Sequence, residues 1–112
     1  MKTIKRTEID KTISELTGIW NHCYYIDENG YATKKLVSTP LAFDTDPATS
    51  WRLLVKWSIK ARICFQQDAH DINIVDAYDN ISGEWLGHGV GKTFGEALSD
   101  AYLNAHGISV ED

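Results

Sequence analysis

Residues 61–107 decide the fold that we expect, and their sequence is ARICFQQDAHDINIVDAYDNISGEWLGHGVGKTFGEALSDAYLNAHG. Residues 61–66 and 72–78 alternate between two sets of side chains, which is typical of β-strands. A third strand is predicted over residues 83–89, and the connections between the three are short and polar. Because short connections favour hairpins over crossovers, we predict a three-stranded antiparallel meander.

A helix is predicted directly after the meander. Thr93 and Glu96 have the spacing of a capping box, in which each side chain bonds a free backbone N–H of the first turn. Gly107 is expected to end the helix. The apolar face consists of Ala97, Leu98, Ala101, Tyr102 and Ala105. Its small side chains indicate close packing onto the sheet.

Two further helices are predicted upstream. The first covers residues 8–17, with a capping box at Thr7 and Asp10 and a stop at Gly18. The second covers 47–57, because Asp46 can cap a helix whose first residue is Pro47. The apolar face expected for this second helix consists of Ala48, Trp51, Leu54 and Val55, with Trp51 in the core.

A weak hairpin is expected between these helices. It comprises a short strand over residues 23–26, a turn over 27–30 that contains Asn-Gly, and a return strand over 31–34. Residues 35–45 are expected to form a loop, and the tails 1–6 and 108–112 to be frayed. The predicted fold is therefore a single α+β domain in the order α-(ββ)-α-β-β-β-α, with the helices segregated beside the sheet.

Length and charge limit the class of protein. The chain has 112 residues, a net charge of −5 and no run approaching the ~20 apolar residues of a membrane span. Because no apolar signal-peptide core precedes the domain, we expect a cytoplasmic protein of a bacterial cell. Cys23 and Cys64 are then expected to be free thiols, with a disulfide between them as the less favoured alternative.

The charges are unevenly distributed along the chain. Residues 1–62 contain ten Lys/Arg and seven Asp/Glu, whereas residues 63–112 contain one Lys and nine Asp/Glu. An acidic half is a poor surface for phosphate backbones, so we do not expect nucleic acid to bind there. An acidic surface instead favours a basic partner, although the same asymmetry could serve solubility alone.

Three local patterns resemble small proteins of tailed phages and prophages. They are SELTG at 14–18 followed by an aromatic residue, FDTDPATSW at 43–51, and GKTFGEAL at 91–98 followed by DAY at 100–102. Together they resemble the phage "ABA sandwich" proteins and the NinX-like proteins of lambdoid phages. Asp44 replaces the usual Ser of that pattern, and no Arg follows Leu98. The resemblance implies a small α/β sandwich of phage or prophage origin and supplies no mechanism.

A weaker resemblance links the meander and last helix to double-stranded-RNA-binding domains and HicB-type antitoxins. The RNA-binding version needs a cluster of Lys and Arg at the start of that helix, to contact phosphates across a groove. This chain offers Lys92 alone, followed by Glu96 and Asp100. We therefore do not predict duplex RNA binding at this surface.

The glycine-rich stretch before the last helix resembles a phosphate-binding loop. A Walker A loop requires its first glycine at the position of Leu86, so the register fails. A flexible strand-to-helix turn is the favoured interpretation, and anion binding at the helix start is the alternative. The candidate ligand residues are Gly87, His88, Gly89, Gly91, Lys92 and Thr93.

No metal, cofactor or catalytic signature is apparent. His22, Cys23 and His70 lack the paired spacing of structural zinc ligands, and no known nucleophile motif occurs. Asp76 lies among apolar residues of a predicted strand. A core position would raise its pKa and mark a site, whereas an open sheet face would let it bond a Tyr or Trp.

The first functional hypothesis is therefore an interaction protein, and the second is a small-ligand or nucleotide-binding domain that uses residues 87–93. Exposed Trp and Tyr anchor interfaces. Two alternatives stay open for Trp57 and Trp85, namely that they fill the core or that they are partly exposed. The predicted surface consists of Trp57, Asp76, Asp79, Glu84, Trp85, Glu96 and Asp100. Its expected partner is a host or phage protein, for instance one that handles nucleic acid or defends against phage. An exposed meander edge also allows a homodimer.

Overall fold

The computed structural model describes residues 2–26 and 28–111, and for residues 22–26 and 32–38 it describes the backbone alone. Asp27, in the expected hairpin turn, lies outside the described residues. The elements in chain order are β1 (Lys2–Lys5), η1 (Arg6–Glu8), α1 (Ile9–Thr17), β2 (Asn21–Ile26), β3 (Ala32–Thr39), α2 (Pro47–Trp57), β4 (Ala61–Gln67), β5 (Asn73–Asp79), β6 (Trp85–Gly91), α3 (Phe94–Ala105) and β7 (Ile108–Glu111). The fold is α+β, as predicted.

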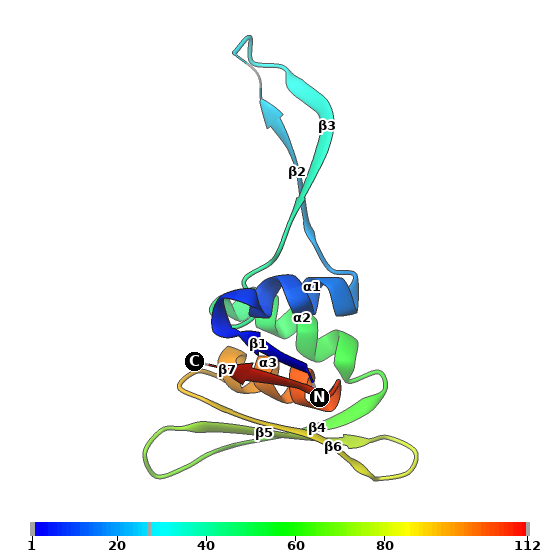
Figure 1. The fold of residues 1–112 in the computed structure, drawn as a ribbon, viewed down its shortest axis with the longest axis vertical. Coiled ribbons are helices and arrows are strands. Elements are labelled where there is room, and N and C mark those ends of the chain that lie inside the picture. The colour runs from blue at the N-terminus through cyan, green and yellow to red at the C-terminus, as the bar shows by residue number, and fades with distance from the viewer. Residues whose placement is uncertain (1, 27, 112) are drawn as a thin grey trace.

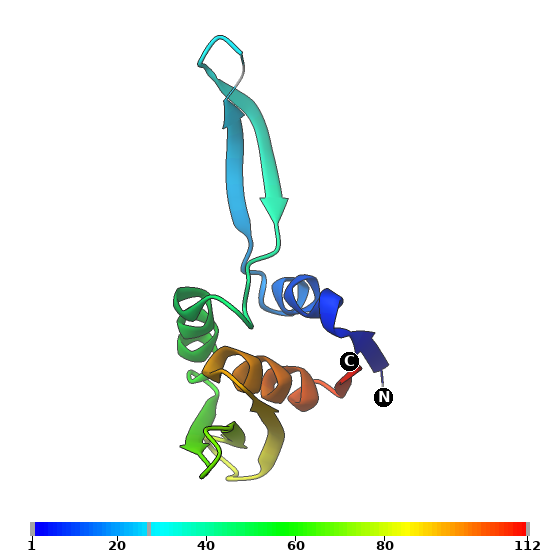
Figure 2. The same ribbon diagram turned by 90° about the vertical axis from the view of Figure 1, so that its left-hand side faces the viewer.

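The body of the protein has three layers (Figures 1 and 2). The antiparallel sheet β4-β5-β6 forms one outer layer, α3 lies on it, and α1 and α2 lie on the far side of α3. Because α3 is covered from both sides, it is buried on most of its circumference, including Leu98, Ser99 and Leu103. All the helices therefore lie on one side of this sheet.

The predicted meander is confirmed, with strand boundaries shifted by one or two residues. The third strand begins at Trp85 instead of residue 83 because the turn before it is longer than expected. In that turn, the backbone N–H of Asp79 bonds the Glu84 carbonyl oxygen at 2.8 Å, and Gly83 adopts a positive φ of 73°. The Asp79 carboxylate accepts hydrogen bonds from the N–H groups of Ser82 and Ile81, which lower its pKa.

The glycine-rich stretch does not form the expected flexible turn. Gly87, Gly89 and Gly91 belong to β6, and only Lys92 and Thr93 connect the strand to α3. A Cβ atom on Gly87 would lie 2.5 Å from the Ala101 carbonyl oxygen, and one on Gly89 would overlap the Ala97 carbonyl oxygen. The glycines therefore let the backbone of β6 approach the backbone of α3, which explains their spacing along one face of the strand.

Helix α2 has its predicted bounds and cap, but the prediction of its buried face was wrong. The Asp46 carboxylate accepts a hydrogen bond from the Thr49 N–H at 3.2 Å, as expected. The buried side chains are Thr49, Ser50, Leu53 and Trp57, and Trp51 is 63% exposed. Small Ser50 faces the interior because its hydroxyl donates to the Phe43 carbonyl oxygen at 2.7 Å and leaves room for α3.

The tails were predicted to be frayed, but their described residues 2–5 and 108–111 form paired strands. Met1 and Asp112 lie outside the described residues. β1 pairs in parallel with β7, in a register that places Lys2 opposite Ile108, and Ile4 and Ile108 are buried. The capping box predicted for Thr7 and Asp10 is also absent, because the Asp10 carboxylate accepts a hydrogen bond from the distant Phe43 N–H. Residues 6–8 form the 3₁₀ turn η1 before α1 begins.

The predicted hairpin is present and longer than expected. β2 and β3 pair as an antiparallel ribbon that extends through residues 35–39, which were expected to be loop. Figure 1 shows the ribbon projecting from the end of the body opposite the meander. Cys23 lies in this ribbon and Cys64 in β4, and the helices of the body lie between these two elements.

Candidate functional site

The candidate site is the face of the β4-β5-β6 sheet that no helix covers, which we call the open sheet face (Figure 2). The strand register arranges its side chains in three rows, each of which crosses all three strands. The rows are Arg62–Tyr78–Trp85, Cys64–Asp76–His88 and Gln66–Ile74–Val90. In the edge strands β4 and β6 these side chains are exposed, and in the central strand β5 they are half-buried.

Asp76 holds together two side chains of the neighbouring strand. Its Oδ1 atom lies 2.8 Å from His88 Nδ1 and accepts a hydrogen bond from the Trp85 indole N–H at 3.3 Å. Trp85 remains 52% exposed, so the second of its two alternatives, partial exposure, applies. Asp76 thus follows the second alternative considered for it, an acid on an open sheet face bonded to a tryptophan. These contacts fix the indole ring in place before any partner arrives.

The first row adds a cation to the aromatic side chains. The Arg62 guanidinium carbon lies 5.3 Å from the centre of the Tyr78 ring, which is a cation–π distance. Tyr78 is the direct cross-strand neighbour of Trp85. One end of the open sheet face therefore presents an indole, a phenol and a guanidinium side by side, and these three groups are enriched at protein interfaces.

Acidic side chains lie around this face. Residues 61–91 contain five acids and a single cation, Arg62. Asp76 is central, and the other four acids lie in or beside the two connecting turns, namely Asp68, Asp71, Asp79 and Glu84. The Asp68 carboxylate accepts hydrogen bonds from the His70 and Ile72 N–H groups at 2.8 and 3.0 Å, so its turn has a defined shape.

The structure does not gather every residue that the sequence suggested for the surface. Trp57 is only 8% exposed, because it packs edge-on against Tyr102 with ring centres 5.1 Å apart. It therefore fills the core, and its place in the predicted surface was wrong. Glu96 caps α3 through the Lys92 N–H, and Asp100 pairs with Arg6 at 3.4 Å. Both acids lie on α3, so they are not part of the open sheet face.

For the second hypothesis, ligand binding by residues 87–93, the structure does not gather the candidate residues around one site. Gly87 and Gly89 face the backbone of α3, and His88 points to the opposite side of β6. At the start of α3, the Thr93 hydroxyl accepts a hydrogen bond from the Glu96 N–H at 3.1 Å, as the capping box predicts. The Glu96 carboxylate accepts from the N–H of Lys92, one residue before the Thr93 N–H that the capping box would use. Lys92 is the only cation of this stretch, and Glu96 lies beside it.

The sequence analysis missed Arg62, Tyr78 and Cys64 as members of the site. The signal that could have identified them is the alternation within residues 61–66 and 72–78. It places Arg62 and Cys64 on one side of their strand, and Tyr78 on the same side of its strand as Asp76. The missing information was the pairing register, which sets Cys64 opposite Asp76 and Asp76 opposite His88. Among the described residues, no group of three His, Cys, Asp or Glu side chains could hold a metal ion.

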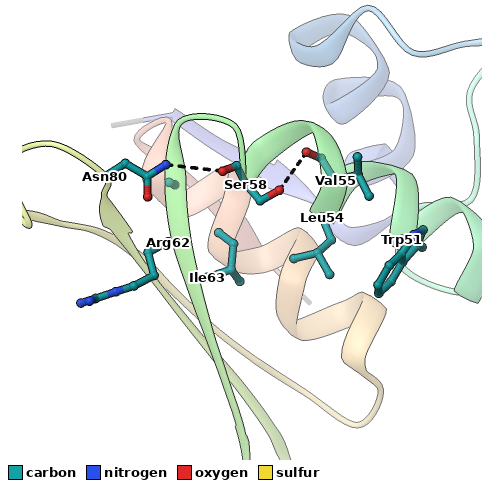
Figure 3. A pocket seen from close by; sticks show the side chains of 8 residues that line it. Trp51, Leu54, Val55, Ser58, Arg62, Ile63 and Asn80 are labelled. Atoms are coloured by element: carbon teal, nitrogen blue, oxygen red, sulfur yellow. Dashed lines mark hydrogen bonds between the residues drawn. The ribbon is translucent and has the colours of Figure 1, made fainter.

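A second feature outside the open sheet face is an apolar groove between α2 and β4 (Figure 3). It has a volume of about 460 Å³. Leu54 of α2 and Ile63 of β4 point into it, and Trp51 lies at one end. This groove exists because α2 buries Ser50 and Leu53, which leaves the apolar face predicted for its core turned outward.

A pair of carboxyl groups joins α1 to the segment before α2. Burial, the charge of Asp44 and a hydrogen bond between the two carboxyl groups raise the pKa of Asp10 to about 6. The folded protein therefore binds a proton at Asp10 more tightly than the unfolded chain, whose Asp has a pKa of 3.8. The stability contributed by this proton is present below about pH 3.8 and is lost as the pH rises through about 6.

We expect Asp10→Asn to raise the melting temperature at pH 7.5 by several degrees and to change it little at pH 4. The amide can keep the hydrogen bond from the Phe43 N–H while it removes the repulsion from Asp44. Thermal unfolding from pH 4 to 8 measures this effect. Asp44→Asn should give a smaller gain, because burial, the largest cause of the raised pKa of Asp10, remains. Asp68→Asn, remote from the pair, should give none. A gain in melting temperature that does not depend on pH would contradict this explanation, because the raised pKa of Asp10 would then not be its cause.

Comparisons with known proteins give no match to this chain among family models, curated proteins or solved structures. The phage resemblance therefore stays a prediction from the sequence. In the part of the chain that the structure describes, no helix has the length and apolar character needed to cross a membrane.

Proposed function

We propose that this protein acts by binding a basic segment of a partner protein on its open sheet face. The observation that carries the proposal is Trp85, an exposed indole that Asp76 holds in place beside Tyr78 and Arg62. An anchor fixed in advance loses little conformational entropy on binding, which favours affinity. Tryptophan, tyrosine and arginine are also the residues that most often dominate binding energy at interfaces.

The charge of the surface selects the class of partner. Five acids and one arginine over residues 61–91 would attract Lys- and Arg-rich segments and accelerate their association. Nucleic acid would meet repulsion at the same surface. The sequence resemblance adds a setting to the proposal, namely a phage or prophage accessory protein that acts on a host protein in the bacterial cytoplasm.

The test is affinity capture from nuclease-treated bacterial lysate with the wild type and two variants, Trp85→Ala and Glu84→Lys. We expect the wild type to retain a basic protein that is lost at high salt, and Trp85→Ala to retain at least about tenfold less of it. The expected cost of about 1.4 kcal/mol or more is that of truncating an interface anchor. Glu84→Lys should slow the association of the purified partner, as measured by surface plasmon resonance.

Tyr31→Ala is the matched control, because Tyr31 is an exposed aromatic residue at the tip of the β2–β3 ribbon, far from the open sheet face. The control should capture the same protein as the wild type. Equal capture by the wild type and Trp85→Ala would contradict the proposal. Loss of capture in Tyr31→Ala alone would assign partner binding to the ribbon instead.

A further inference from the structure

Two features with unsatisfied binding capacity lie on the same side of the molecule, and neither belongs to the open sheet face. One is the outer edge of β4, which pairs with β5 on one side only. The other is the exposed apolar face of α2, which lies above β4 (Figure 2). Both line the groove of Figure 3. A single occupant could therefore satisfy the strand edge and the helix face together.

The strand edge presents unpaired backbone groups. The Lys60 carbonyl oxygen and the Asp68 N–H both bond toward β5, to Asn80 and Ile72. In an antiparallel strand the direction of these groups alternates, so even-numbered residues of β4 face β5 and odd-numbered residues face outward. No described strand pairs with the outward N–H and C=O groups of residues 61, 63, 65 and 67.

Apolar side chains accompany this edge. Phe65 contacts Phe94 edge-on with ring centres 5.0 Å apart, yet it remains 52% exposed. On α2, Trp51 and Val55 are 63% and 50% exposed. Trp51 and Phe65 alone offer roughly 250 Å² of surface, given the 150–250 Å² that a whole aromatic side chain can bury. That is about a third of the ~800 Å² that each partner contributes to a stable interface.

We propose that a second copy of this chain occupies this side, with β4 paired antiparallel to β4 of the copy about a two-fold axis at Cys64. Cys64 is the middle residue of the seven-residue strand, so this register pairs its full length. It sets Ile63 opposite Phe65 of the copy and Arg62 opposite Gln66. Lys60 then faces Asp68 of the copy at both ends of the pairing, so the charges are complementary.

The two-fold axis also brings the α2 helices of the two copies toward each other, because each lies above its own β4 (Figure 2). Trp51 and Val55 would then be covered by the same surface of the second copy. The result is one six-stranded antiparallel sheet with no β4 edge left open. Dimerisation is independent of the partner proposed above, but it would place two open sheet faces on one continuous surface.

The register makes a specific covalent prediction. The backbone N–H and C=O groups of even-numbered residues in β4 bond to β5. Cys64 and its counterpart in the second copy therefore form a non-hydrogen-bonded pair, whose Cα atoms lie about 4.5 Å apart. That distance is within the range of disulfides, and Cys64 is an exposed free thiol. Added diamide, a diazene oxidant that takes up the two electrons and two protons released by the two thiols, should therefore convert a Cys23→Ser variant into a disulfide-linked dimer. The Cys23→Ser/Cys64→Ser double variant should form none.

The oligomeric state is measured by light scattering with size-exclusion chromatography and by sedimentation equilibrium. We expect twice the 12.6 kDa chain mass for the wild type and for Trp85→Ala, and the single-chain mass for Phe65→Lys. Val90→Lys, on the opposite edge strand, is the matched control and should stay dimeric. A single-chain mass for the wild type at 100 μM would overturn the proposal. A dimer without the Cys64 cross-link would equally overturn it, because the copies would then meet elsewhere.

Discussion

Gly89→Ala is expected to destabilise the protein by at least about 3 kcal/mol, a large fraction of the ~5–15 kcal/mol that stabilises a typical domain. The new Cβ atom would overlap two backbone atoms of α3, the Ala97 carbonyl oxygen and the Ala101 nitrogen. Backbone cannot move aside as a flexible side chain does, so the sheet and α3 would have to separate. Urea unfolding followed by circular dichroism measures the loss.

Two further variants of β6 should lose less stability than Gly89→Ala. Gly87→Ala should be damaging but milder, since its Cβ would lie 2.5 Å from the Ala101 carbonyl oxygen and 2.8 Å from the Ala105 nitrogen. Val90→Ala, on the outer side of the same strand, should cost less than about 1 kcal/mol. A Gly89→Ala protein with wild-type stability would show that the helix and strand are not in backbone contact. The glycines would then need another explanation, and ligand binding at residues 87–93 would regain support.

The elements that the sequence predicted best are those defined by local chemistry. Asp46 and Pro47 set the start of α2, and Thr93 with Glu96 set the start of α3, because caps act on backbone groups within one turn. The meander could be predicted equally well, since alternation and short polar turns are local signals. For the same reason, Trp85 was correctly placed in the third strand, while its exposure was left open.

What the sequence did not predict depends on contacts between distant segments. The pairing of β1 with β7 joins the two ends of the chain, and no local pattern in residues 2–5 indicates a partner near residue 108. The buried face of α2 was missed because α3 and Phe43 select Ser50 over the larger Trp51. The open sheet face likewise required the register of three strands, which places Arg62 and Tyr78 beside Trp85.

Phe43→Ala should be the other strongly destabilising change, with an expected cost of about 3–5 kcal/mol. Phe43 is fully buried although it lies in the loop before α2, and its backbone links two helices. Its N–H donates to the Asp10 carboxylate of α1 at 3.0 Å, and its carbonyl oxygen accepts from the Ser50 hydroxyl of α2 at 2.7 Å. Losing the ring would leave a cavity in the hydrophobic core, and urea unfolding would detect the loss of stability.

Phe43→Leu serves as the control, because it keeps most of the apolar volume and should cost less than about 1.5 kcal/mol. A cost below about 1 kcal/mol for Phe43→Ala would contradict the central role of this residue. The same variant separates stability from binding, since Phe43 and the open sheet face lie on opposite sides of α3. At a temperature where Phe43→Ala is still folded, it should bind the captured partner as the wild type does, whereas the stable Trp85→Ala should not.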